Sequence, residues 1–145
     1  MGQLQFSPPP PQAELLHVWV LNSQEELRGL RLALQQALSD YTSTAIERLA
    51  DVPDRMVLVA TELATNAIKY GRPPTEVRLL HTDDQFVVEV VDGDVSTVPE
   101  LVDTRPVNAG GRGLLIAQSF SLNVGWYATE TTKNVWAAFP MRPEP

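Results

Sequence analysis

Apolar residues along the chain recur with two different periods, which predict an alternation of strands and helices. The run Leu15 to Leu21 is short, apolar and rich in valine, and polar residues follow it, so it predicts a buried strand. Leucines spaced three and four apart then predict a helix over about Gln24 to Leu38. A second helix is predicted from Pro53 to Tyr70, because proline suits a first helical turn and Gly71 follows the last one.

The second half of the chain predicts two pairs of strands with an irregular segment between them. Thr75 to Leu80 and Gln85 to Val91 predict a hairpin with a polar four-residue loop. Asn123 to Ala128 and Asn134 to Met141 predict the second pair. The segment Val95 to Gly113 has no period and contains prolines and glycines, which is typical of a functional or mobile segment.

Strands adjacent in sequence, with the helices grouped, predict a two-layer α/β sandwich of the α+β kind. Its sheet is expected to be mixed and largely antiparallel, with the helices on one face. A short helix is expected over Leu114 to Phe120. Residues 15–141 form the predicted domain, whereas the proline-rich leader 1–14 and the tail 142–145 are expected to be loose.

Composition narrows the classes of function. The chain is 43% hydrophobic and 20% charged, as ordinary globular domains are, and its lack of cysteine excludes disulfides and cysteine zinc sites. The net charge of −7 argues against binding nucleic acid or anionic membranes directly. No apolar run reaches the ~20 residues of a membrane span, and the start has no signal-peptide pattern, so a cytoplasmic location is expected.

The second predicted helix carries a narrow polar line on an otherwise apolar surface. Glu62 and Asn66 lie four positions apart, so they project from one face, and Lys69 continues the line. An asparagine oxygen can ligate Mg²⁺, and a glutamate can accept a proton. Taken alone, this pair is more typical of a solvated helix face, because such residues are ordinarily exposed.

Two glycine-containing motifs are candidates for ligand contact. Asp92-Gly93 follows an apolar strand, where a carboxylate can accept a hydrogen bond from an amine such as that of adenine, although Asp-Gly is also a common turn. Gly110-Gly111-Arg112-Gly113 precedes Leu114 and the expected short helix. Glycines at a helix start leave backbone N–H groups free to face a phosphate, although the Walker lysine is missing.

Together the three motifs resemble those of a known superfamily. Thr61 to Gly71 resembles the N box of the GHKL ATPases with the Bergerat fold, Val91-Asp92-Gly93 resembles the G1 box, and Gly111 to Leu114 resembles the G2 box. The small size and the sequence GGRGLL are similar to anti-sigma factor serine kinases of the RsbW and SpoIIAB type.

The resemblance implies roles for these residues. Asn66 would ligate Mg²⁺ at the phosphates of ATP, and Glu62 would act as general base. Asp92 would bind the adenine amine beside Gly93. The remaining nucleotide contacts implied are Lys69, Gly110, Gly111, Arg112, Gly113, Leu114 and Asn134. Members of the family commonly dimerise, hold a sigma factor inactive and phosphorylate a serine on an anti-anti-sigma antagonist of the STAS type.

Departures from the family pattern leave a second function open. Asp94 stands where another glycine is usual, and Asn134 stands where the family has threonine near adenine. The alternative is a partner-binding module of the same fold with weak or no ATP binding. A third reading, the ATPase domain of a sensor histidine kinase, is disfavoured because no dimerising helix with a phosphoacceptor histidine precedes it.

Overall fold

The structure is a computed structural model that describes residues 2–3, 6–7, 9, 12–42, 52–95, 100–101 and 123–140. The described strands are β1 (Gly2–Gln3), β2 (Glu14–Leu21), β3 (Thr75–His81), β4 (Gln85–Asp92), β5 (Glu100–Leu101), β6 (Asn123–Ala128) and β7 (Lys133–Pro140). The described helices are the 3-10 turn η1 (Gln24–Glu26), α1 (Leu27–Thr42) and α2 (Val52–Tyr70).

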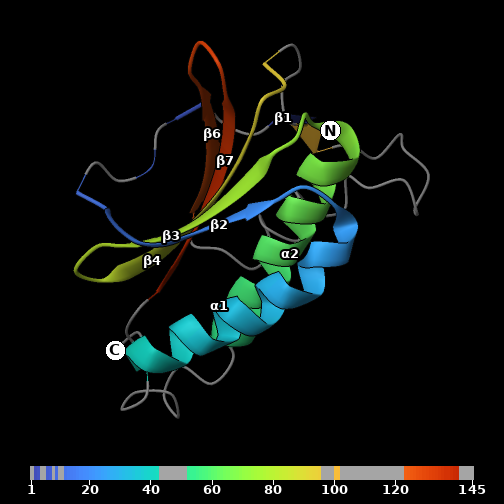
Figure 1. Cartoon of the computed structure of the whole chain (residues 1–145). Helices are drawn as coiled ribbons and strands as arrows, with labels where there is room; N and C mark the ends of the chain where they lie inside the picture. Colours follow the sequence, from blue (N-terminus) through green and yellow to red (C-terminus); the bar gives the residue numbers. More distant parts are fainter. Residues whose placement is uncertain are drawn as a thin grey trace.

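A five-stranded sheet in the order β2-β3-β4-β7-β6 forms one layer, and α1 and α2 form the other (Figure 1). Each neighbouring pair in this sheet is antiparallel. Both helices lie on the same side of the sheet, as Figure 1 shows. The predicted two-layer α+β sandwich is therefore confirmed, with an antiparallel sheet.

The main core lies between the sheet and the two helices, and alternation along the strands decides which residues enter it. In β4, Phe86, Val88 and Val90 pack in this core with residues of α1 and α2. The intervening Val87 belongs to a second, smaller cluster with Trp136 and Ala138 of β7. The sheet thus has an inner face toward the helices and an outer face with its own apolar cluster.

The helix boundaries are close to those predicted, with one extension. α2 begins one residue before the predicted Pro53 and ends at Tyr70 as predicted, whereas α1 continues past the predicted end to Thr42. At the start of the first helical segment the side chain of Glu26 accepts the backbone N–H of Asn22 at 3.0 Å, an arrangement that satisfies an orphan donor. The predicted helix over Leu114 to Phe120 lies outside the described residues.

The apolar run Leu15 to Leu21 forms a strand, but the prediction that it is buried is wrong. β2 lies at the edge of the sheet and pairs only with β3 there. Its alternate residues face outward, so Leu15, Val18 and Val20 are 55%, 42% and 51% exposed. An apolar run does not distinguish a central strand from an edge strand, because both satisfy the same hydrophobic pattern.

The N-terminal leader, which was expected to be loose, contacts the domain at its described residues. Gly2–Gln3 pairs antiparallel with β5, and Phe6 forms a parallel bridge with Trp126 of β6. The Ser7 N–H donates to the carbonyl of Trp126, and its own carbonyl accepts from Nε1 of Trp136, both at 2.8 Å. Ser7 also lies against Gly125, where a Cβ would come within 2.5 Å of its hydroxyl.

Candidate functional site

The polar line of α2 is placed as the sequence predicts. Glu62 and Asn66 are both half-buried, one helical turn apart. The flanking hydroxyls of Thr61 and Thr65 each donate to a helix carbonyl four residues earlier, at 2.7 Å. These threonine hydroxyls therefore hydrogen-bond within the helix, and Glu62 and Asn66 are the carboxylate and the amide of this polar line.

The end of α2 meets the end of β4 through Gly71. A Cβ on Gly71 would lie 2.5 Å from Cγ and 2.6 Å from Oδ2 of Asp92. No side chain fits there, so the glycine that ends the helix also lets the Asp92 carboxylate pack against it. This contact brings the motif that ends in Gly71 and the motif Asp92-Gly93 to one place.

Asp92 is a buried carboxylate with remaining capacity to accept hydrogen bonds. It is 5% exposed, its Oδ1 accepts the N–H of Asp94 at 2.7 Å, and Nζ of Lys133 lies 3.9 Å from Oδ2. Burial raises the pKa of Asp92 above its ordinary value, although the hydrogen bond from Asp94 and the charge of Lys133 oppose this. A carboxylate has about four acceptor positions, so a further donor such as an amine can still be accommodated.

A second buried polar atom at the same end of the sheet has no hydrogen-bond partner among the residues that the structure describes. It is the hydroxyl oxygen of Thr75. The next residue in β3, Glu76, pairs with Val91, which precedes Asp92 in β4. Thr75 and Asp92 are therefore at the same end of neighbouring strands. Because a buried hydroxyl without a partner is costly, it is an independent sign that this end of the sheet suits a polar ligand.

Gly93 completes the turn after β4 and leaves room beside Asp92. Its N–H donates to the carbonyl of Arg72 at 3.2 Å. A Cβ at this position would make ordinary contacts, at 3.6 Å from Cβ of Arg72 and 4.0 Å from the carbonyl oxygen of Thr131. Packing against the described residues therefore does not require glycine at this position.

This geometry agrees with a comparison of the sequence with known families. The family described as the histidine kinase-like ATPase domain matches residues 20–139. The chain belongs to this family. No curated protein matches it. A histidine kinase-like ATPase domain implies ATP binding, and the residues at the junction of α2 and β4 are those that the GHKL resemblance assigns to it.

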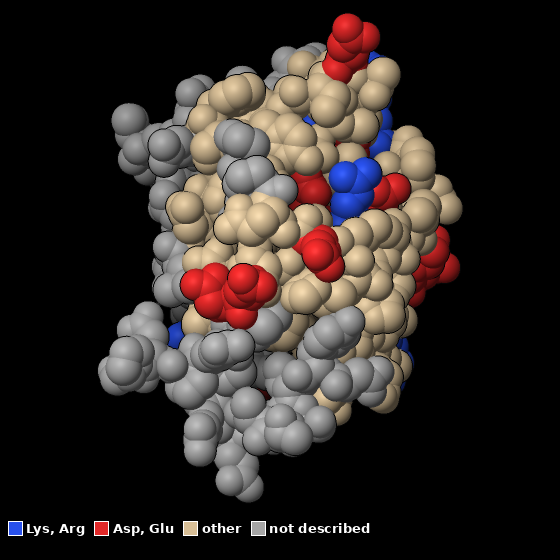
Figure 2. All heavy atoms as spheres, turned by 90° about the vertical axis from the view of Figure 1, so that its left-hand side faces the viewer, with Lys and Arg blue, Asp and Glu red and all other residues tan. Residues whose placement is uncertain are grey.

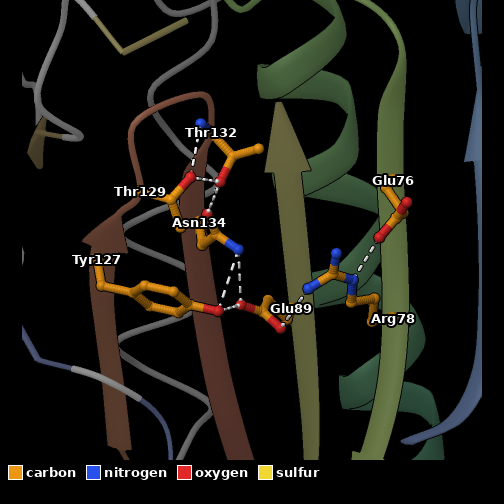
Figure 3. A network of polar contacts seen from close by, with 7 residues as sticks. All are labelled: Glu76, Arg78, Glu89, Tyr127, Thr129, Thr132 and Asn134. Carbon is orange, nitrogen blue, oxygen red and sulfur yellow. Dashed lines mark hydrogen bonds and ion pairs between the residues drawn. The ribbon is translucent and has the colours of Figure 1, made fainter. Parts of the chain in front are cut away.

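In the structure Asn134 does not lie beside Asp92. Asn134 pairs with Val91, and its side chain projects from the outer face of the sheet, where its amide donates to Glu89 at 2.9 Å (Figure 3). Lys133, which pairs with Asp92, is the β7 residue on the inner face. The expected contact of Asn134 with adenine is therefore not supported by its position, because successive side chains of a strand point to opposite faces.

On the outer face, Asn134 belongs to a buried polar network around Glu89 that the sequence did not predict (Figure 3). Glu89 is 2% exposed, accepts the hydroxyl of Tyr127, and has Arg78 at 3.6 Å. Burial and the Glu89 carboxylate raise the pKa of Tyr127 to about 12. The signal in the sequence was a single carboxylate within the apolar strand Gln85–Asp92, since a buried charge needs partners.

The remaining predicted contacts are Lys69 and the glycine cluster with Leu114. Lys69 is exposed in the last turn of α2. Gly110, Gly111, Arg112, Gly113 and Leu114 lie outside the described residues. Within the described ranges no group of three acidic or histidine side chains could hold a metal ion by itself, and no helix is long and apolar enough to cross a membrane.

Proposed function

We propose that this ATPase domain is an Mg²⁺- and ATP-dependent serine protein kinase that also acts as an anti-sigma factor. The contact of Gly71 with Asp92 supports the proposal most directly, because it joins the helix that carries Glu62 and Asn66 to the strand end that carries a buried acceptor. Phosphoryl transfer depends mainly on positioning and on neutralising charge, so a few well-placed groups suffice.

The nucleotide contacts in this proposal come from the junction and from the glycine cluster. The Asp92 carboxylate accepts the adenine amine, and Gly93 lies beside the ring. Asn66 would contribute an oxygen ligand to Mg²⁺, and that ion would supply charge neutralisation at the phosphates. The cluster Gly110 to Gly113 holds phosphates through backbone N–H groups, with Arg112 as a charged donor.

Glu62 is the catalytic base in this scheme. The hydroxyl oxygen of the substrate serine forms a bond to the γ-phosphorus, the bond from that phosphorus to the bridging oxygen breaks, and ADP leaves. Glu62 accepts the proton of the serine hydroxyl during this transfer. Its half-buried position on α2 gives a carboxylate that is both held in place and accessible.

The proposed partners are a sigma factor and an anti-anti-sigma antagonist of the STAS type, and a homodimer is the proposed assembly. These partners rest on the resemblance of the sequence GGRGLL and of the helix motif to anti-sigma factor serine kinases. The acidic net charge of −7 is compatible with protein partners and disfavours direct contact with nucleic acid.

Calorimetric titration with ATP and Mg²⁺ tests the nucleotide site, with GTP as a matched control. ATP should bind, and Asn66→Ala should weaken binding in the presence of Mg²⁺ much more than in its absence. GTP presents a carbonyl where adenine has its amine, so binding should be at least tenfold weaker for a site that depends on Asp92. Equal binding of ATP and GTP would contradict the role of Asp92.

Transfer of labelled γ-phosphate to a STAS-type antagonist tests the kinase activity. Glu62→Ala should remove transfer while leaving ATP affinity within about twofold, because the base acts on the protein substrate. Asn66→Ala should reduce both. Undiminished transfer by Glu62→Ala would rule out its role as base.

A partner-binding module without nucleotide is the second candidate, and two observations favour it. Asn134 is turned away from Asp92, and the Asp92 carboxylate already has Lys133 and the N–H of Asp94 as neighbours. Binding of a sigma factor that is equal with and without ATP, together with no calorimetric signal for ATP, would establish this function instead.

A further inference from the structure

The free edge of β2 is the clearest unpaired feature of the described part of the sheet. A register shift interrupts its pairing with β3 between Leu15 and His17. From there His17–Leu21 runs in continuous register against β3, with no partner strand on its other side in the sheet order. An antiparallel edge presents alternate N–H and C=O groups outward, ready to pair with another chain.

Beyond the register shift, the segment His17–Leu21 has few of the features that protect natural edge strands. The segment His17–Leu21 reads HVWVL, with no lysine and no proline, and only the register shift before it departs from a regular strand. Val18 and Val20 are exposed on the outer face. On the inner face the rings of His17 and Trp19 stack with centroids 5.4 Å apart, so the strand is supported from that side.

A groove runs beside the same segment. It has a volume of about 530 Å³ and is lined by Val18–Leu21 on one side and by Glu25, Glu26, Gly29 and Leu30 on the other. A Cβ on Gly29 would meet no atom within 4 Å, so space remains open above this part of α1. Its volume and the open space at Gly29 leave room for side chains beside the β2 edge.

Charge decides which strand would fit. Both charged residues that line the groove are glutamates, and the Glu26 carboxylate already accepts the Asn22 N–H. A second copy of this chain, paired antiparallel about the middle of β2, would bring Glu14 toward Glu25 and Glu26 of its partner, and each copy carries a net charge of −7. Like charges in such positions disfavour self-pairing, whereas a basic segment gains attraction.

We propose that the β2 edge and its groove bind an extended basic peptide segment of a partner protein as an added strand. Apolar residues of that segment lie over Val18 and Val20, and alternate basic residues enter the groove near Glu25. Main-chain hydrogen bonds supply most of the affinity, and the two side-chain rows supply specificity. The proposal does not depend on nucleotide binding, because the groove is lined by β2, η1 and α1 and by none of the candidate ATP contacts.

Fluorescence anisotropy with the full chain and a labelled peptide of alternating lysine and valine tests this proposal. The charge reversal Glu25→Lys should weaken binding at least fivefold, and Asp83→Lys, which makes the same charge change on the exposed β3–β4 loop, should change it less than twofold. Gly29→Phe should also weaken binding, because its side chain occupies the groove. Equal effects of Glu25→Lys and Asp83→Lys would overturn the proposal in favour of unspecific attraction.

Two further measurements distinguish strand addition from other occupants. The same peptide N-methylated at alternate amides should lose binding, and retained binding would show that no strand is added. Sedimentation velocity without peptide measures the oligomeric state of the chain. We expect Val20→Lys to leave this state unchanged, because the β2 edge does not pair with a second copy. A dimer that Val20→Lys dissociates would assign the edge to a second copy and overturn the proposal.

Discussion

Replacing Gly71 by alanine tests the contact that joins the two motifs of the candidate site. The new Cβ would lie 2.5 Å from Cγ of Asp92 and 2.6 Å from the carbonyl oxygen of Ala67. One of these atoms belongs to a buried side chain and the other to the helix backbone, so neither can withdraw freely. Either Asp92 moves, or the last turn of α2 opens.

The close contacts of the new Cβ determine how much Gly71→Ala should lower the free energy of unfolding. Overpacking in a well-packed region costs about 1–3 kcal/mol. For a domain of this size that corresponds to a drop in Tm of about 3–10 °C. Displacing the Asp92 carboxylate would remove the proposed charge-assisted hydrogen bond to adenine, worth about 1.5–3 kcal/mol, so ATP affinity should fall by roughly 10- to 100-fold.

Thermal unfolding and ATP titration measure the two effects, and Gly29→Ala provides the control. A Cβ on Gly29 meets nothing within 4 Å, and alanine favours a helix over glycine by about 0.8–1 kcal/mol, so this variant should be equally or more stable. It should bind ATP as the native chain does.

An unchanged Tm and unchanged ATP affinity for Gly71→Ala would refute the reasoning, because the helix end and Asp92 would then not be in contact. A lower Tm with unchanged ATP affinity would show that Gly71 contacts Asp92 but that this contact does not contribute to ATP binding. Matching losses in Gly29→Ala would show that the assay does not report on this junction.

Three further changes give separate expectations. Gly93→Ala should alter stability by less than about 1 kcal/mol but weaken ATP binding, measured by melting and calorimetry, because its Cβ makes only ordinary protein contacts and faces the proposed ring. Because the pKa of Asp92 is raised in the folded state, protonation of Asp92 stabilises the fold at pH values below the ordinary pKa of 3.8. This stabilisation is lost as the pH rises through the raised pKa. Asp92→Asn should therefore be equally or more stable than the native chain at pH 7 in urea unfolding, with that advantage gone below pH 3.8. The pKa of Tyr127, about 12 against an ordinary 10.0, predicts stability that falls between pH 10 and 12, and Glu89→Gln should lower this pKa in an absorbance titration.

Local patterns were enough to predict the helix and strand positions and the placement of Glu62 and Asn66 on one helix face. The helical period fixes that spacing wherever the helix packs. The contact of Gly71 with Asp92 could not be predicted in the same way, because it depends on how far α2 and β4 extend before they end. The exposure of Val18 could not be predicted either, because the hydrophobic pattern of one strand does not determine its position in the sheet.

Strand alternation explains why Asn134 does not lie beside Asp92 and what separates the two faces of the sheet. Val91 pairs with Asn134 and Asp92 with Lys133, so neighbouring positions of β4 and β7 serve opposite faces. The inner face at this end holds the proposed adenine acceptor, and the outer face holds the Glu89 network. Figure 2 looks onto the left-hand side of Figure 1, where acidic and basic groups interrupt an otherwise uncharged described surface. Because adjacent residues point to different faces, single substitutions one position apart can separate nucleotide binding from effects on the outer surface. Partner binding that responds to Asn134→Ala but not to Lys133→Ala would assign that function to the outer face.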